Sequence, residues 1–163
     1  MIGIIEGFID YVFRDQVRPK IGSVVYCDLW AVEHSGIYIG DNRIVHLDGS
    51  GKIEIVTPKQ FIDRLGGLNN AINIYVSCKD TQAVGSSLVA YTAELRVGVT
   101  LDYDIILNNC HKFTYECISR DLFGFDGHKF TLSDVKKAAN KYMGVNTWRM
   151  WESPEYGKFI IDE

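Results

Sequence analysis

Two histidines bracket a short run that is typical of a β-hairpin, and this hairpin constrains the fold more than any other feature. The run EHSGIYIGDNRIVHL occupies residues 33–47 and has His34 and His46 near its two ends. Asp41 and Asn42 tolerate a positive φ, so this pair predicts a tight turn between two antiparallel strands. The two histidines are then expected at the open end of the hairpin, on neighbouring strands.

The rest of the chain predicts an α+β fold, with one antiparallel β-meander packed against helices that come before and after it. Short runs of β-branched and aromatic residues indicate strands at residues 23–30, 34–40, 42–47, 52–57 and 70–78. Helical spacing of apolar residues indicates helices at residues 2–13, 57–65, 80–97, 110–123 and 131–143. Within the hairpin, alternation places Ile37 and Ile39 on one face and Gly36 and Tyr38 on the other.

Capping residues support two of these helices. Thr57 precedes Pro58, and Thr131 lies three residues before Asp134, which is a capping-box spacing. The helix expected at 80–97 has a periodic set of larger side chains, namely Val84, Leu88, Tyr91 and Leu95. The aromatic C-terminal segment 146–163 is expected to pack on the core, with a role in lining the substrate cleft as the alternative.

Residues 2–13 form an amphipathic pattern in which Glu6 and Asp10 avoid the apolar face. We expect this helix to pack on the domain. Contact with a membrane surface stays open because the apolar face is large, although interfacial helices usually carry Lys and Arg on their polar face.

Length and composition exclude several classes of protein. The 163 residues suit one domain, residues 1–163, whose core needs no disulfide or cofactor. A composition of 47% hydrophobic and 23% charged residues with a net charge of -4 is typical of a soluble protein and disfavours nucleic-acid binding. The four cysteines have no CxxC spacing and are expected to be free thiols in a reducing compartment.

The sequence also shows no clear targeting signal. No run approaches the roughly 20 apolar residues of a membrane span, and the N-terminus has no basic region of the secretory type. The expected location is the cytoplasm, although delivery by a dedicated secretion system would leave no such signal.

Cys110 is the cysteine whose position suits a nucleophile. A cysteine attacks as the thiolate, and a free thiol with a pKa of about 8.5 is mostly protonated at neutral pH. Cys110 falls in the first turn of an expected helix, where unpaired N–H groups stabilise an anion. Cys27, Cys78 and Cys117 lie in strands or deeper in that helix, so we interpret them as small core residues.

The base for this thiol must come from another part of the fold. A hairpin that turns at residues 41–42 suits His34 as the base and His46 as the group that holds its second ring nitrogen. Asn108 and Asn109 are the candidates to cap the cysteine helix, which would leave the Cys110 N–H as an oxyanion donor. These residues predict a Cys-His-His triad for acyl transfer, which needs no metal and no cofactor.

His111 and Lys112 follow the nucleophile on its helix. Adjacent helical positions point about 100° apart, so His111 is poorly placed to be the base for Cys110. We expect it to lie at a solvated helix start, and the alternative is that it tunes the thiolate or, with Lys112, meets a phosphate head group. His128 is expected to be an ordinary surface or core residue. The chain has zinc-ligand residue types but no compact two-ligand motif, so no metal site is expected.

Two segments of the chain resemble a known family. Residues 22–47, GSVVYCDLWAVEHSGIYIGDNRIVHL, followed by NNCHKF at 108–113, are similar to the lecithin:retinol acyltransferase-like family within the NlpC/P60 superfamily. The resemblance covers about residues 20–123 and implies a circularly permuted papain-like fold, in which the histidine strands precede the cysteine helix. It also implies Cys110 as nucleophile, His34 as general base and His46 as the third polar member.

The resemblance further implies a chemistry. Members of this family form a thioester with an acyl group from a glycerophospholipid, or cleave an amide, and pass the acyl group to an acceptor such as water. We therefore expect a phospholipid or another acyl ester as substrate, with peripheral membrane contact. An amidase or cysteine peptidase acting on cell-wall or protein amides stays as the first alternative. A non-catalytic binding module on the same fold is the second.

Two departures from the family pattern leave the predicted triad intact and bear instead on the prediction of the substrate class. The usual Asn-Cys-Glu-His-Phe becomes Asn-Cys-His-Lys-Phe at residues 109–113, and the aromatic residue often found two places before the first histidine is Val32. Asn109, His111 and Tyr38 are the candidates for contact with the substrate or the oxyanion.

Overall fold

The computed structural model describes residues 16–29, 32–63, 73–101, 110–122 and 127–152. Its strands are β1 (Gln16–Val17), β2 (Val24–Leu29), β3 (Val32–Gly40), β4 (Arg43–Leu47), β5 (Ile53–Val56), β6 (Ile74–Lys79), β7 (Gln82–Ala83) and β8 (Thr147–Trp151). Its helices are α2 (Pro58–Asp63), α3 (Ser87–Glu94), α4 (Cys110–Ser119) and α5 (Leu132–Met143).

The strands form one sheet in the order β1-β8-β6-β2-β3-β4-β5, with β7 paired to β6. The pairs from β2 to β5 are antiparallel and follow chain order, as a meander does. The pair of β1 with β8 is parallel. The expected mixed α+β fold, with a meander and packed helices, is confirmed.

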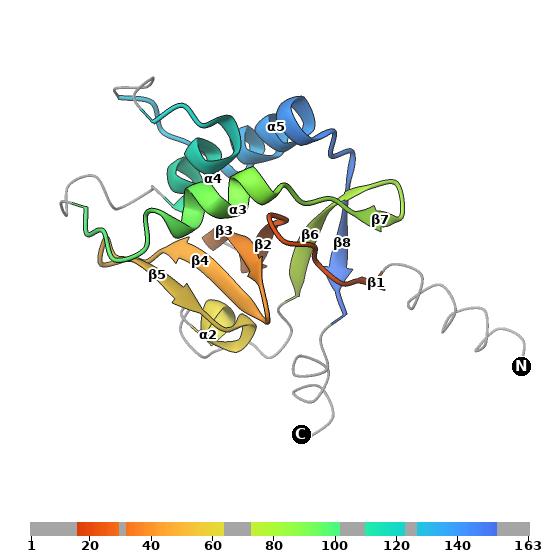
Figure 1. Ribbon diagram of the computed structural model, residues 1–163, viewed down its shortest axis with the longest axis horizontal. Helices are drawn as coiled ribbons and strands as arrows, with labels where there is room; N and C mark the ends of the chain where they lie inside the picture. The colour runs from red at the N-terminus through yellow and green to blue at the C-terminus, as the bar shows by residue number, and fades with distance from the viewer. Residues whose placement is uncertain (1–15, 30–31, 64–72, 102–109, 123–126, 153–163) are drawn as a thin grey trace, which may run out of the picture.

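Helices cover the two faces of this sheet unequally. α3, α4 and α5 lie together over one face, and α2 lies on the other (Figure 1). Ile37 and Ile39 of β3 contribute to the core under the three helices, whereas Tyr38 contributes to the core on the α2 side. The predicted alternation in β3 is therefore confirmed, and it decides on which face each site residue lies.

Local signals for turns and caps are also confirmed. Asp41 and Asn42 have φ values of 51° and 53°, which allows the two-residue turn between β3 and β4. Thr131 caps α5 in a capping box with Asp134, and the helix ends at Gly144 in the left-handed conformation.

The structure corrects the helix expected at residues 80–97. Residues 82–83 form β7, and α3 begins only at Ser87 because the chain first turns back along β6. Val84 of the predicted periodic set is partly buried against the core, but the other three residues of the set are exposed. Leu88, Tyr91 and Leu95 are 45%, 57% and 65% exposed, and the small side chains Val89, Ala90 and Ala93 are buried instead. Small residues allow α3 to approach the neighbouring elements closely, and this outweighs the spacing of the larger ones.

The aromatic segment after α5 contributes a strand that periodicity did not indicate. β8 inserts between β1 and β6, and Trp148 and Trp151 pack on opposite faces of the sheet. Core packing is thus the role of residues 147–151. The helix expected at 2–13 and the remainder of the C-terminal segment from residue 153 lie outside the described residues.

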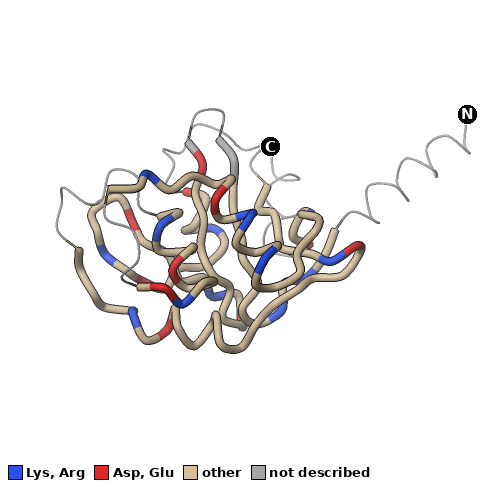
Figure 2. The backbone as a smooth tube through the Cα atoms, turned by 90° about the horizontal axis from the view of Figure 1, so that it is seen from above, with Lys and Arg blue, Asp and Glu red and all other residues tan. Residues whose placement is uncertain are grey.

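Charges are mixed along the described backbone, where Lys and Arg are interspersed with Asp and Glu (Figure 2). Among the described residues, no helix combines the length and the apolar character needed to cross a membrane.

Candidate active site

His34 and His46 form a buried pair. Nε2 of His34 lies 2.6 Å from Nδ1 of His46, and both side chains are buried. The register of β3 against β4 pairs Ile37 with Val45, so the two histidines are diagonal neighbours on one face of the sheet. Diagonal positions lie within reach of aromatic side chains, which explains how the rings meet.

Phe61 of α2 closes over this pair. Its ring centroid lies 4.7 Å from that of His34 and 5.7 Å from that of His46. A side chain at Gly36 would prevent this packing, because a Cβ there would lie 2.8 Å from Val45 O and 3.2 Å from Phe61 Cε2. The glycine between His34 and Tyr38 thus leaves room for the ring that holds the histidines in place.

Cys110 begins α4 and lies against β3. Its Sγ is 4.0 Å from the carbonyl oxygen of Glu33. The backbones of Ser35 and His111 also form hydrogen bonds with the thiol. The residue between the two β3 contacts is His34, so the thiol lies beside the part of the strand that carries the histidine. Cys110 is half-buried, whereas Cys27, Cys78 and Cys117 are buried.

The helix start does not make the Cys110 thiol acidic. Burial raises the pKa of Cys110, and this outweighs the lowering by the backbone hydrogen bonds of Ser35 and His111. The nearby charge of Glu33 raises the pKa further. The favourable helix N-terminus therefore does not offset the desolvation of the thiol. A base must therefore take the proton as the thiol reacts.

Removing the charge of Glu33 is expected to speed alkylation of Cys110. Glu33→Gln removes a negative charge that disfavours the thiolate, so the pKa of Cys110 falls and iodoacetamide labelling near pH 7 rises by about twofold. The Glu33 side chain is 46% exposed, so the gain should shrink at high salt. Labelling rates measured from pH 6 to 10 test this, and an unchanged midpoint would contradict it.

A buried polar cluster fastens the first turn of α4 to β3. The Ser35 Oγ lies 2.8 Å from His111 Nδ1 and 2.9 Å from Thr114 Oγ1. Thr114 in turn donates to the carbonyl oxygen of Cys110 over 3.0 Å. The expected solvated helix start is wrong, because His111 is only 8% exposed. Burial lowers the pKa of His111 to about 4, so it brings no positive charge to the thiolate at neutral pH.

This buried histidine predicts a pH dependence of stability. Burial lowers the pKa of His111 from 6.5 to about 4, so between these values the unfolded chain binds a proton that the folded chain does not. The free energy of unfolding should therefore fall by about 2–3 kcal/mol as the pH drops through this window. Urea unfolding of wild type and His111→Gln at several pH values measures the difference, and parallel curves for the two proteins would contradict the prediction.

Glu54 is a site residue that the sequence analysis missed. It lies directly opposite His46 in the pairing of β4 with β5. Its Oε1 is 3.4 Å from His46 Nε2, and its Oε2 is 3.5 Å from Lys52 Nζ. The register of the second hairpin was the available signal, because pairing residues 43–47 with 53–56 brings these two side chains together.

The other predicted site residues lie elsewhere or are not described. Tyr38 packs its ring on Trp151 at 5.2 Å, four residues along β3 from His34. The His128 side chain is 53% exposed, and its Nε2 lies 3.5 Å from Asp134 Oδ2. Asn109 lies outside the described residues. Within the described part of the chain, no set of three or more His, Cys, Asp or Glu side chains is arranged to hold a metal ion.

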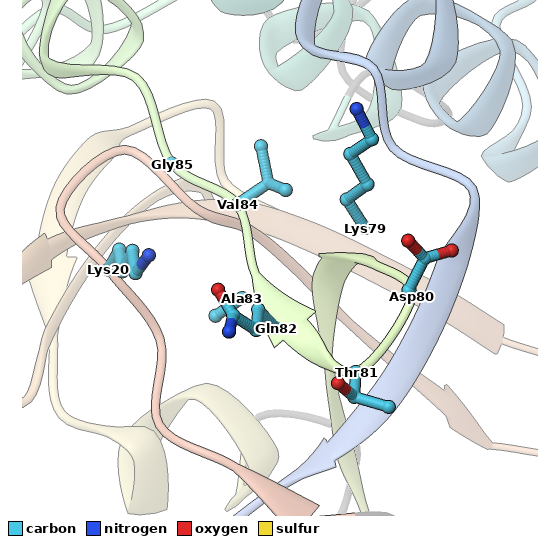
Figure 3. A pocket seen from close by; sticks show the side chains of 8 residues that line it. All are labelled: Lys20, Lys79, Asp80, Thr81, Gln82, Ala83, Val84 and Gly85. Carbon is cyan, nitrogen blue, oxygen red and sulfur yellow. The ribbon is translucent and has the colours of Figure 1, made fainter.

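A pocket of about 440 Å³ lies at the turn between β6 and β7. Its lining, shown in Figure 3, consists of Lys20, Lys79, Asp80, Thr81, Gln82, Ala83, Val84 and Gly85. Lys20 and Lys79 lie on opposite sides of it and do not converge (Figure 3). The pocket shares no residue with the histidine pair or with the thiol.

Comparison with known proteins relates the chain to acyltransferases and to viral polyproteins. The protein-family model described as Lecithin retinol acyltransferase matches residues 17–122, which include the histidine pair, Glu54 and Cys110. The genome polyproteins of avian encephalomyelitis virus, strains L2Z and Calnek vaccine, are each 29% identical to this chain over 125 residues. The match covers 75% of this chain but only 6% of each polyprotein.

Proposed function

Because the chain belongs to the lecithin retinol acyltransferase family, we propose that it hydrolyses or transfers acyl groups through a thioester on Cys110. His34 is the general base and His46 its orienting partner, which makes a Cys-His-His triad. The order of histidine strands before cysteine helix is that of a circularly permuted papain-like fold. The observation that carries the proposal is the 2.6 Å contact of the two histidines, beside the strand segment that contacts the thiol.

The first half of the reaction uses Nδ1 of His34, because its Nε2 is engaged with His46. Nδ1 takes the proton from Cys110 Sγ while the sulfur attacks the acyl carbonyl carbon. The electron pair of the C=O bond moves to the oxygen, which the Cys110 N–H and one further donor stabilise. The bond to the leaving alcohol then breaks, and the alcohol takes the proton from His34.

The second half releases the acyl group. Water or another acceptor gives a proton to His34 as it attacks the thioester carbon. The carbon–sulfur bond breaks, and the proton returns to Cys110. Since the raised pKa of Cys110 keeps the resting thiol protonated, each half of the cycle depends on His34 as a proton carrier.

We propose a phospholipid or another acyl ester as the acyl donor. A lipid donor brings the protein to a membrane surface as a peripheral partner. All four cysteines are free, which suits a reducing compartment such as the cytoplasm. No metal or cofactor takes part in this scheme.

Lipid vesicles and amide substrates distinguish the candidate activities. Wild-type protein is incubated with phosphatidylcholine and phosphatidylethanolamine vesicles and, separately, with peptide amides and peptidoglycan fragments. We expect free fatty acid and lysophospholipid by mass spectrometry, and their loss in Cys110→Ala. Cys117→Ala is the matched control, because this thiol lies on the same helix but is buried, with a pKa raised to about 12.

The remaining outcomes contradict the proposal in different ways. Cleavage of amides without cleavage of esters would make the protein an amidase or cysteine peptidase. If neither class reacts and iodoacetamide labels Cys110 no faster than the buried cysteines, the fold serves as a binding module.

A further inference from the structure

The histidine pair leaves one question open, which is where its protons lie. A hydrogen bond between two neutral imidazoles needs one donor and one acceptor, and His34 Nε2 and His46 Nδ1 can each take either part. Only one arrangement leaves Nδ1 of His34 with the lone pair that the proposed base needs. The other arrangement puts a proton on that nitrogen and makes His34 unable to accept one from the thiol.

Glu54 resolves this choice. A carboxylate is an acceptor only, so His46 Nε2, 3.4 Å from Glu54 Oε1, must carry its proton toward the carboxylate. His46 Nδ1 is then the acceptor, and His34 Nε2 donates to it over 2.6 Å. The proton of neutral His34 is thereby on Nε2, and Nδ1 has the lone pair.

The surroundings favour this arrangement. His46 is fully buried, and the Glu54 side chain is only 21% exposed. Little water therefore screens the interaction between the carboxylate and His46. Two titratable groups that contact His46 are His34 on β3 and Glu54 on β5. Lys52, which lies 3.5 Å from Glu54, is 56% exposed. From α2, the group that contacts the pair is the uncharged ring of Phe61.

The hairpin that carries Glu54 has a fixed register. Asp48 Oδ1 accepts hydrogen bonds from the backbone N–H groups of Ser50 and Lys52, at 2.7 and 2.9 Å. These bonds shape the turn between β4 and β5, and His46 pairs with Glu54 directly across the two strands. The carboxylate is therefore held in place by the backbone as well as by its own contacts.

We propose that Glu54 is a positioning residue that sets the tautomers of His46 and His34 and so makes His34 Nδ1 the base. The inference rests on the proposed function, because it explains how that base is prepared. Glu54 is placed to act on the base through His46. It acts through a chain of two hydrogen bonds that ends at the catalytic histidine.

Three variants test this role. Glu54→Leu has no acceptor and should slow hydrolysis of a p-nitrophenyl ester by about 10- to 100-fold at saturating ester, with little change in KM. Glu54→Gln keeps an acceptor oxygen but loses the charge that favours imidazolium. The hydrolysis rate of this variant should fall less than that of Glu54→Leu. The apparent pKa of the acid limb of its pH–rate profile should fall by about one pH unit. Lys52→Met removes the surface ion pair alone and should behave as wild type.

A spectrum that needs no substrate separates this inference from the proposed function. Two-bond ¹⁵N–¹H correlation NMR above pH 8 should find the protons of His34 and His46 on Nε2 in the wild type, and a changed tautomer in Glu54→Leu. Protons on Nδ1 of His46 in the wild type would overturn the inference. So would equal rates and pH profiles for Glu54→Leu and Lys52→Met. An inactive wild type with the expected tautomers would instead refute the proposed function.

Discussion

Replacing His34 with alanine is expected to slow acylation of Cys110 by about 10²- to 10⁴-fold, because the thiol loses its general base. Burial already raises the pKa of Cys110, so little thiolate is present to react without help. The release of p-nitrophenol from a short-chain p-nitrophenyl ester measures this rate. The loss should be smaller at high pH, where hydroxide can remove the thiol proton.

His128→Ala is the matched control for this variant. It removes the same side chain from an exposed position, where it contacts Asp134 and Phe130. Its acylation rate should stay within about twofold of the wild type, as expected for a surface change. If His34→Ala and His128→Ala acylate at equal rates, His34 is not the base.

Replacing Phe61 with alanine is expected to have the largest effect on stability. The ring is fully buried between α2 and the sheet, so its loss should lower the free energy of unfolding by about 3–5 kcal/mol. The variant also removes the wall against which both histidines pack. Acylation of Cys110 should therefore fall more than the folded fraction alone explains. Urea unfolding and the ester assay, run on the same samples, measure the two effects.

Two variants separate packing from the site effect. Phe61→Leu keeps an apolar wall and should retain most of the activity. Val135→Ala opens a cavity in the core on the other face of the sheet, so it should lower stability without a matching loss of activity per folded molecule. Equal activity per folded molecule in Phe61→Ala and Val135→Ala would show that Phe61 does not hold the histidines.

The hairpin and the capped helices could be predicted because their signals are local. Asp41 and Asn42 need only their own backbone preference to set a two-residue turn, and Thr131 with Asp134 caps α5 through contacts three residues apart. The period of two in β3 then decides which side chains share a face. For this reason the closeness of His34 and His46 could be anticipated from residues 33–47 alone.

Features that depend on packing between distant segments could not be predicted in this way. Glu54 sits in an Ile-Glu-Ile run, where alternation suggests a solvated carboxylate, yet pairing with β4 turns it toward His46 while Ile55 is 42% exposed. The partners of His111 on β3 are equally distant in sequence, and burial there reverses the expectation of a solvated residue. The raised pKa of Cys110 has the same origin, because desolvation depends on the whole environment of the thiol.

The intact mass of the protein after brief incubation with phospholipid vesicles and an acid quench tests the central claim most directly. The account predicts a gain equal to one fatty acyl group. Peptide mapping should place it on Cys110, and neutral hydroxylamine should remove it, as expected for a thioester. Glu54→Leu should accumulate the adduct more slowly, and Cys110→Ala should show none. Turnover of the lipid with no adduct on Cys110 under any quench time, or an adduct on another residue, would contradict the account.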